Sequence, residues 1–318
     1  MSRRRYFIQQ SVMVMVAALL WTMTVCVNSV RAQADQPDSD RPVYRTESFS
    51  IDTPAELNVH TSGGFINVSG REGSDVTVKV YVQKDGQYLS TDQTDLKNYD
   101  LTIEHEGSKI DVRAKSKGFW GNNSMSVSFV VTVPRQTSSE LHTSGGSITT
   151  KNLEGQQQVR TSGGHLTLTD IEGKTEARTS GGHINLSNVT GDTEARTSGG
   201  HIQVDGLTGN SSLRTSGGHI TLNDIAGTIN ARTSGGHINA AIVEVGDHVD
   251  LKTSGGNVHV TVPGGKGYDL DLEGNMVSSK LENFNGSVER DEVKGTVNGG
   301  GPRVYAKTSG GMVKVDYK

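Results

Sequence analysis

One tetrapeptide recurs at a fixed step and limits what this chain can fold into. Thr-Ser-Gly-Gly begins every 18 residues through the middle of the sequence, and one more copy follows after a step of 20. The regular copies begin at Thr143, Thr161, Thr179, Thr197, Thr215 and Thr233, the next at Thr253, and two outlying copies at Thr61 and Thr308. A unit this short cannot bury its own apolar face, so it must stack on neighbouring copies.

Each unit contains two short alternating segments, as residues 183–200 illustrate. Ile184 and Leu186 alternate with polar residues in the first segment, and Thr193 and Ala195 do so in the second. A period of two residues indicates a β-strand with one buried face. We therefore predict an all-β chain that forms a single-chain parallel β-solenoid of 18-residue coils. Each strand would pair with its equivalent about 4.8 Å away.

Columns of inward-pointing residues can be assigned from the same spacing. The first strand supplies Ile148, Leu166, Ile184, Ile202, Ile220 and Ile238, followed by Thr150, Leu168, Leu186, Val204, Leu222 and Ala240, and then by Leu153, Ile171, Val189, Leu207 and Ile225. The opposite strand supplies Val159, Ala177, Ala195, Leu213, Ala231 and Leu251. These columns predict a thin core, which agrees with a chain that is 32% hydrophobic and only 5% aromatic.

The regular step ends on both sides, which predicts caps of different design. Open solenoid ends need covering, and atypical terminal units are expected there. The predicted organisation is a signal peptide over 1–34, a flexible segment over 35–42, an N-terminal β cap over 43–142 with a polar loop insertion at 84–124, the regular solenoid over 143–262, and a C-terminal β cap over 263–318.

The first 34 residues have the layout of a secretory signal peptide. Three arginines at 3–5 precede an apolar stretch over 11–27, and small residues suitable for cleavage follow. A membrane anchor is the alternative, but the stretch is at the short limit for a span. The arginines also resemble a twin-arginine signal, so the export route stays open. We predict an exported protein, periplasmic or at the cell surface, without a stable transmembrane anchor after cleavage.

Removal of this segment changes the charge and the cysteine content of the chain. The 31 basic residues fall to 27 against 35 acidic ones, so the net charge moves from −4 to −8. An acidic chain argues against nucleic acid as a partner, because phosphate binding needs a basic surface. The sole cysteine, Cys26, lies inside the segment. The remaining chain therefore has neither a disulfide nor a thiolate.

Several segments together resemble a known bacterial family. They are residues 57–66, Val-Thr-Val-Pro at 131–134, the serial Thr-Ser-Gly-Gly-His-Ile units, and the glycine-rich ending at 298–301 and 308–311. In these features the chain resembles the exported adhesin-like proteins of the DUF4097 type, over roughly residues 45–318. The resemblance implies a right-handed β-helix or β-roll in the cell envelope. It implies no known catalytic residues.

A histidine follows Gly-Gly in five successive units. The column comprises His165, His183, His201, His219 and His237. Parity places it on the outer face, where imidazoles one coil apart could share Zn²⁺ or Ni²⁺. No column of acids or cysteines adjoins it to complete a ligand set, so a solvated ladder is the favoured interpretation. Adjacent imidazolium charges repel, so the column should resist full protonation, and below about pH 6 it would make this face positive.

The outer face of the second strand carries a basic column. It comprises Arg160, Arg178, Arg196, Arg214, Arg232 and Lys252. It could act as an anion stripe for acidic polysaccharide or phosphate groups. A solvated, partly salt-bridged face is favoured, because Glu176 and Glu194 lie on the same face.

Two further features have competing interpretations. The Thr column is expected to point inward and satisfy corner backbone groups rather than form a flat ice-binding surface. Trp120, beside Phe119 in a glycine-flanked loop, could stack on a sugar or a partner. Folding back over the open end of the thin core as a cap is slightly favoured.

An enzymatic function has little support from the residues. General acid–base chemistry needs two converging groups, whereas Asp170, Glu172 and Asp224 are scattered among turns. We therefore predict a non-catalytic, adhesin-like envelope protein that binds polysaccharide or protein surfaces through side-chain ladders. It would hold no cofactor. A metal- or pH-responsive binder is the first alternative, and a β-helix carbohydrate-active enzyme is the second.

Overall fold

Every regular element that the structure describes is a β-strand. The computed structural model describes residues 41–97, 99–117 and 125–318, and over these residues it contains 26 strands and no helix. All of the strands lie in the unit Val43–Lys318. The all-β prediction is confirmed, whereas the predicted signal peptide over 1–34 lies outside the described residues.

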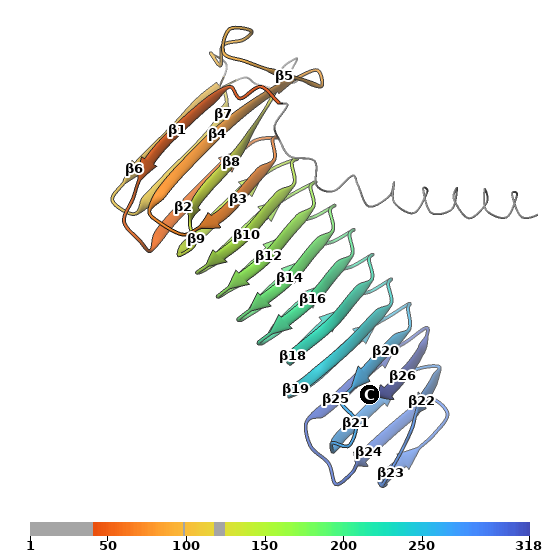
Figure 1. Ribbon diagram of the computed structural model, residues 1–318. Helices are drawn as coiled ribbons and strands as arrows, with labels where there is room; N and C mark the ends of the chain where they lie inside the picture. The colour runs from red at the N-terminus through yellow and green to blue at the C-terminus, as the bar shows by residue number, and fades with distance from the viewer. Residues whose placement is uncertain (1–40, 98, 118–124) are drawn as a thin grey trace, which may run out of the picture. The chain divides into compact units, whose positions relative to one another are not determined.

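The first strand of each coil belongs to one ladder, which runs along the stack in Figure 1. In spatial order its members are β8 (Met125–Pro134), β3 (Ile66–Arg71), β10 (Ile148–Glu154), β12 (Leu166–Glu172), β14 (Ile184–Thr190), β16 (Ile202–Thr208), β18 (Ile220–Arg232), β19 (Ile238–Thr253), β20 (Val258–Val262), β26 (Met312–Tyr317) and β22 (Met276–Ser279). Neighbours pair in parallel. Ile184 lies opposite Leu166 on one side and Ile202 on the other, as the 18-residue step predicted.

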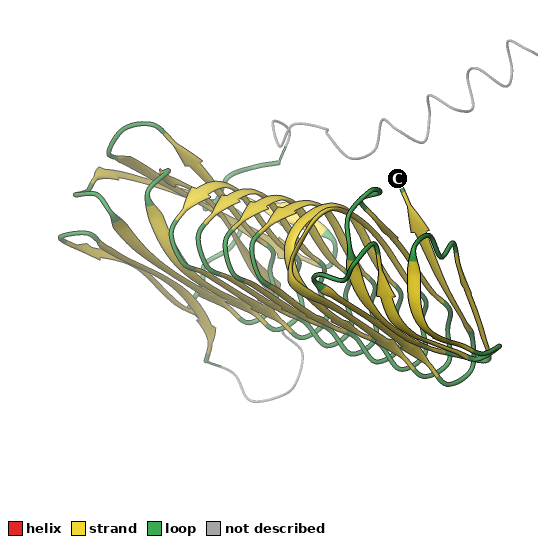
Figure 2. Ribbon diagram, turned by 90° about the horizontal axis from the view of Figure 1, so that it is seen from below, coloured by secondary structure: helices red, strands yellow, loops and turns green. Residues whose placement is uncertain are grey.

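The second strand of each coil belongs to a parallel ladder across the thin core (Figure 2). Its members are β7 (Lys109–Ser116), β2 (Ala55–Thr61), β9 (Thr137–Thr143), β11 (Gln157–Thr161), β13 (Thr175–Arg178), β15 (Thr193–Arg196), β17 (Ser211–Arg214), the second halves of β18 and β19, β25 (Arg303–Thr308) and β21 (Tyr268–Glu273). Because β18 and β19 continue through the corner, each contributes to both ladders.

The core is built from the columns that the sequence predicted. The assigned Ile, Leu, Val and Ala positions of both strands are buried. One detail differs. β14 does not alternate strictly along its whole length, because Asn188 takes a left-handed conformation with φ 54°. This residue interrupts the alternation, so both Leu186 and Val189 point inward.

The threonine of the repeated tetrapeptide ties successive corners together. The Thr197 hydroxyl donates to the Gly182 carbonyl of the previous coil at 2.9 Å and accepts the Gly200 N–H at 3.3 Å. Its side chain is buried, as are the equivalent threonines of the other copies. The predicted hydroxyl ladder is confirmed, and it satisfies backbone groups that no strand pairing reaches.

Antiparallel strands cover both ends of the stack, so the pairing is not parallel throughout. They comprise β1 (Arg45–Ser50) on β4 (Asp75–Lys84), β4 on β8 and on β5 (Gln87–Leu89), β6 (Tyr99–Glu106) on β7, and β24 (Glu292–Val297) on β21 and β23 (Phe284–Val288).

At both ends of the stack a coil is also inserted out of sequence order. β2 and β3 lie between β7–β8 and β9–β10, while β25 and β26 lie between β19–β20 and β21–β22.

The predicted loop insertion at 84–124 requires correction. It contains β5, β6 and β7, and Ile110, Val112 and Ala114 of β7 are buried against β2. The segment is polar because one face of this hairpin is exposed at the end of the stack. Its alternation was present in the sequence but lacked the 18-residue step.

Candidate functional site

The five histidines of the predicted column form a stack on the outer face of the first ladder. Neighbouring ring centroids lie 4.9–5.0 Å apart, and the interplanar angles are 3–10°. Four of the rings are exposed, and His183 is half-buried. The parallel, in-register coils impose this spacing, because each histidine follows Gly-Gly at the same place in its coil.

Each ring also accepts a backbone hydrogen bond from the next coil. The N–H of His183 donates to His165 Nδ1 at 2.9 Å, and the same bond recurs along the column at 2.8–2.9 Å. His237 Nδ1 accepts from Asn257 N–H at 2.8 Å. An Nδ1 atom that accepts carries no proton, so the rings are neutral with hydrogen on Nε2.

The column continues with other acceptors at its two ends. Ser147 Oγ accepts the N–H of His165 at 3.1 Å, and Asn257 Oδ1 accepts that of Met312 at 2.9 Å. From Ser147 to Asn257, the position after Gly-Gly supplies a side-chain acceptor to the next coil, as serine, asparagine and neutral histidine can all do. Sequence parity placed the histidines on the surface but gave no sign of this bond.

A metal-binding role for the column fits this geometry poorly. A metal at Nε2 would move the ring proton to Nδ1, where it would face the backbone N–H that Nδ1 now accepts. The nearly parallel rings also do not converge on a point. Among the residues that the structure describes, no group of three His, Cys, Asp or Glu side chains could hold a metal ion. Zinc or nickel at the column stays a prediction.

Acid is expected to destabilise the protein through this column. Burial, and then the neighbouring imidazoles, lower the pKa of His183 and of His219. In the unfolded chain these histidines regain the ordinary pKa of about 6.5, so at a given pH they bind more protons than in the folded protein. Their contribution to the free energy of unfolding is therefore fully present above about pH 6.5. It is lost as the pH falls from there through the lowered pKa values of the folded protein. Each N–H···Nδ1 bond lost on protonation should cost about 1 kcal/mol.

Asparagine offers a matched control, because Asn257 already fills this position in the next coil. Replacing all five column histidines by Asn keeps an acceptor that does not titrate. We expect similar melting temperatures for the two proteins at pH 7.5 and a smaller fall for the Asn variant at pH 5, measured by circular dichroism. An equal fall in both proteins would contradict the role given to the column.

The predicted basic column is present on the outer face of the second ladder. Arg160, Arg178, Arg196, Arg214, Arg232 and Lys252 lie in register on successive strands. Glu176 contacts Arg160 and Arg178 at 3.5 Å. Glu194 contacts Arg178 at 3.1 Å and Arg196 at 3.5 Å. The predicted partial salt-bridging is therefore observed in the first half of the column.

Pairing differs in the second half of the column. Asp250 contacts Arg232 at 3.5 Å and Lys252 at 3.0 Å. Within the described part of the chain, Arg214 makes no ion pair, because Ser212 occupies the place that Glu194 fills one coil earlier. Arg214 is exposed.

The structure lengthens this column beyond the residues that the sequence predicted. The register adds Arg113, His60 and His142 at one end and Lys307 at the other. The rings of His60 and His142 stack at 4.8 Å, and burial lowers the pKa of His60, with His142 as the second cause. These residues come from outside the regular repeat, so sequence spacing could not align them with it.

A groove of 580 Å³ follows the second half of the column. Five cations line it, namely Arg196, Arg214, Arg232, Lys252 and Lys307. The rest of the lining consists of hydroxyl residues that follow them in sequence, namely Thr197, Ser198, Thr215, Ser216, Thr233, Ser234, Thr253, Ser254 and Ser309. The serines are exposed, whereas the threonines are buried. The accessible surface of the groove is thus positively charged and rich in hydroxyl groups.

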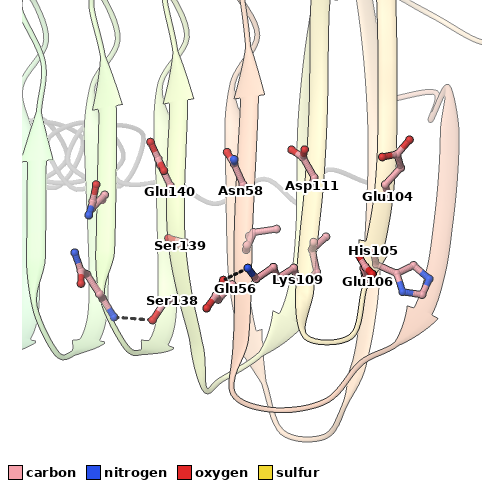
Figure 3. A pocket seen from close by; sticks show the side chains of 14 residues that line it. Glu56, Asn58, Glu104, His105, Glu106, Lys109, Asp111, Ser138, Ser139 and Glu140 are labelled. Atoms are coloured by element: carbon pink, nitrogen blue, oxygen red, sulfur yellow. Dashed lines mark hydrogen bonds and ion pairs between the residues drawn. The ribbon is translucent and has the colours of Figure 1, made fainter.

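A second, acidic depression of 920 Å³ lies at the other end of the same face (Figure 3). Its carboxylates are Glu56, Glu104, Glu106, Asp111 and Glu140, which come from β2, β6, β7 and β9. Lys109 Nζ lies 3.7 Å from a carboxylate oxygen of Glu56. The acids lie on neighbouring strands of this face, and Glu104 is directly opposite Asp111 on the paired strands β6 and β7. Sequence analysis missed this grouping, because its members are far apart along the chain.

The remaining predicted site residue, Trp120, lies outside the described residues together with Phe119. Its two predicted roles, a binding tip and a cap, stay predictions. Loss of glycan binding by a folded Trp120→Ala protein would support the tip, whereas unfolding would support the cap.

Comparison with known protein families shows which family this chain belongs to. The family model described as Toastrack DUF4097 matches residues 58–316. The chain belongs to this family. The match spans both caps and the regular coils of this Toastrack protein, and no curated protein matches it. The right-handed winding that the family resemblance implies stays a prediction.

Solved structures similar to this Toastrack chain include proteins of Parabacteroides and Bacteroides species. A proposed lipid-binding protein of Parabacteroides distasonis shares 15% identity with a TM-score of 0.46, covering 85% of this chain and 96% of that one. A proposed adhesin of Bacteroides fragilis shares 12% identity with a TM-score of 0.38, covering 86% and 96%. A proposed adhesin of Parabacteroides distasonis shares 15% identity with a TM-score of 0.39, covering 87% and 98%.

The described residues of this Toastrack chain contain no helix that is long and apolar enough to cross a membrane.

Proposed function

We propose that this protein is an exported, non-catalytic, adhesin-like component of the cell envelope that binds polymers or protein surfaces through its ladders. The observation that carries the proposal is the register of identical exposed side chains on successive coils, such as Arg196 opposite Arg214 and His201 opposite His219. A rigid stack of parallel coils repeats one weak contact at intervals of about 4.8 Å. Repeated weak contacts give useful avidity only to a ligand that is itself repetitive or extended.

Export is supported by the basic and apolar layout of residues 1–34 and by the absence of cysteine beyond Cys26. A chain without disulfides in an oxidising compartment depends on packing and hydrogen bonds. The buried columns and the threonine bonds at the corners supply these. The envelope location would place the exposed ladders against polysaccharide or against neighbouring protein surfaces.

Polymer length provides the test of this function. The immobilised protein should retain at least one polymer from a panel of acidic polysaccharides, neutral polysaccharides and solubilised envelope fractions. Fragments of two or three repeat units should bind at least about tenfold more weakly than the full polymer, because they contact fewer coils. The matched control is a polymer of equal length and different repeat unit. Retention of nothing on the panel, or equal affinity for fragments and polymer, would sink the proposal.

The same panel tests the enzymatic alternative. Incubation with each retained polymer should release no shorter products. Cleavage that disappears on replacing a single carboxylate, for example Glu140→Gln in the acidic depression, would instead establish a carbohydrate-active enzyme.

A pH-responsive function is a second candidate, favoured by one observation. The five stacked imidazoles accept backbone hydrogen bonds only while they are neutral. Acid would therefore change both the charge of this face and the bonds between coils.

A further inference from the structure

We propose that the groove along the second half of the basic column binds a linear acidic polysaccharide, with Arg214 as its central contact. The proposal rests on the proposed function and names its site and ligand class. Five cationic side chains from five strands line the groove. At about 4.8 Å per strand, Arg196 and Lys307 are about 19 Å apart along the stack.

The spacing selects an extended ligand over a compact one. A single phosphate or carboxylate would meet one or two of these cations, whereas a polymer with an anionic group on each repeat unit would meet all five. Guanidinium groups suit this role, because they bind carboxylate or sulfate oxygens through two parallel hydrogen bonds. The exposed serines beside each cation add hydroxyl partners for the hydroxyl groups of a sugar.

Competition from carboxylates locates the strongest contact. Arg160 pairs with Glu176, and Arg178 lies between Glu176 and Glu194. An anionic ligand there must displace an existing ion pair. The same holds inside the groove for the cations that pair with Glu194, Asp250 and Glu273, which are Arg196, Arg232, Lys252 and Lys307. Arg214 has no such partner among the described residues, so it presents its whole charge to a ligand.

Negative charge elsewhere on the outer face of the second ladder limits where an acidic polymer can bind. The depression near β2, β7 and β9 carries five carboxylates and would repel it. The groove begins at Arg196, several coils away, and extends toward Lys307. A polyanion is therefore directed to the C-terminal half of the face.

Acidic polysaccharide is favoured over nucleic acid by the groove lining. Single-stranded nucleic acid binding relies on aromatic platforms that stack with successive bases. The lining of this groove contains only Arg, Lys, Ser and Thr. Hydroxyl groups in this number suit a sugar chain better than a base.

The test compares two substitutions that change the charge of the same column equally. Arg214→Glu reverses the charge inside the groove, and Arg160→Glu does so outside it. On successive strands Arg160 lies about 10 Å from Arg196, which exceeds the Debye length of about 8 Å at physiological salt. The probe is polygalacturonate, with its methyl ester as the uncharged match. Circular dichroism should show that both variants keep their fold, because both sites are exposed.

We expect the protein to bind polygalacturonate and not the methyl ester. Arg214→Glu should weaken binding about tenfold and Arg160→Glu less than about twofold, by biolayer interferometry at 150 mM salt. Equal losses in the two variants would overturn the site. Tighter binding of a single-stranded oligonucleotide with the same dependence on Arg214 would overturn the ligand class. Failure to bind polygalacturonate, with retention of another polymer on the panel, would overturn this inference and leave the proposed function standing.

Discussion

Gly200→Ala is expected to lower the free energy of unfolding by about 3 kcal/mol. A Cβ atom at Gly200 would lie 1.9 Å from the Gly182 carbonyl oxygen and 2.5 Å from its carbon. Both of these are backbone atoms. A Cβ added at Gly182 would likewise lie 1.8 Å from the Gly164 carbonyl oxygen, so the next corner in the stack is equally tight. The corner therefore cannot yield without moving the coils stacked on it, and overpacking of this kind costs 1–3 kcal/mol or more.

Gly199 supplies the control for this change, because it is the neighbouring glycine of the same tetrapeptide. A Cβ at Gly199 would lie 3.6 Å from the Gly181 carbonyl oxygen, which is an ordinary contact. Gly199→Ala should change the free energy of unfolding by no more than about 0.5 kcal/mol. Urea denaturation followed by circular dichroism measures both variants. Equal destabilisation by the two substitutions would show that the close approach of the corners is not what requires glycine.

Thr197→Val is expected to lower the free energy of unfolding by about 2–4 kcal/mol. The change keeps the shape of the side chain and removes the hydroxyl that joins Gly182 and Gly200. The site is only 3% exposed, so water cannot replace the lost bonds. Each buried backbone group left without a partner costs about 1–3 kcal/mol.

Thr197→Ser separates the hydroxyl from the methyl group at this site. Serine keeps both hydrogen bonds and should lose only about 1 kcal/mol, which corresponds to one buried methyl group. The same urea measurements apply, with the melting temperature as a second readout. A serine variant as unstable as the valine variant would mean that packing, and not hydrogen bonding, fixes threonine in the motif.

The local architecture of the coils was predictable from sequence spacing. Ile184, Leu186 and Val189 were assigned to the core from the repeat, and all three are buried. The threonine ladder and the outward basic column were assigned in the same way. A strict 18-residue step fixes register, because a strand slipped by one residue would turn its whole apolar set to the surface.

Other features could not be predicted, since they depend on strands that the repeat does not contain. His60 and His142 are 82 residues apart, yet they stack because the coil of β2 and β3 is inserted beside the first regular coil. The acidic depression gathers Glu56, Glu104 and Glu140 for the same reason. Hydrogen bonding of the column histidines to the next coil was also not visible in the sequence.

The sequence by itself determined the coil, its core columns and its exposed ladders, because a period repeated without change repeats every local interaction. The tertiary structure decided the order of the terminal coils, and with it the full length of the basic column and the position of the acidic depression. It also decided that, among the cations of the basic column and the described residues around them, Arg214 alone lacks a carboxylate partner. These properties arise from contacts with terminal strands that do not follow the 18-residue repeat. Sequence spacing therefore could not predict them, and only the packing of those strands against the coils reveals them.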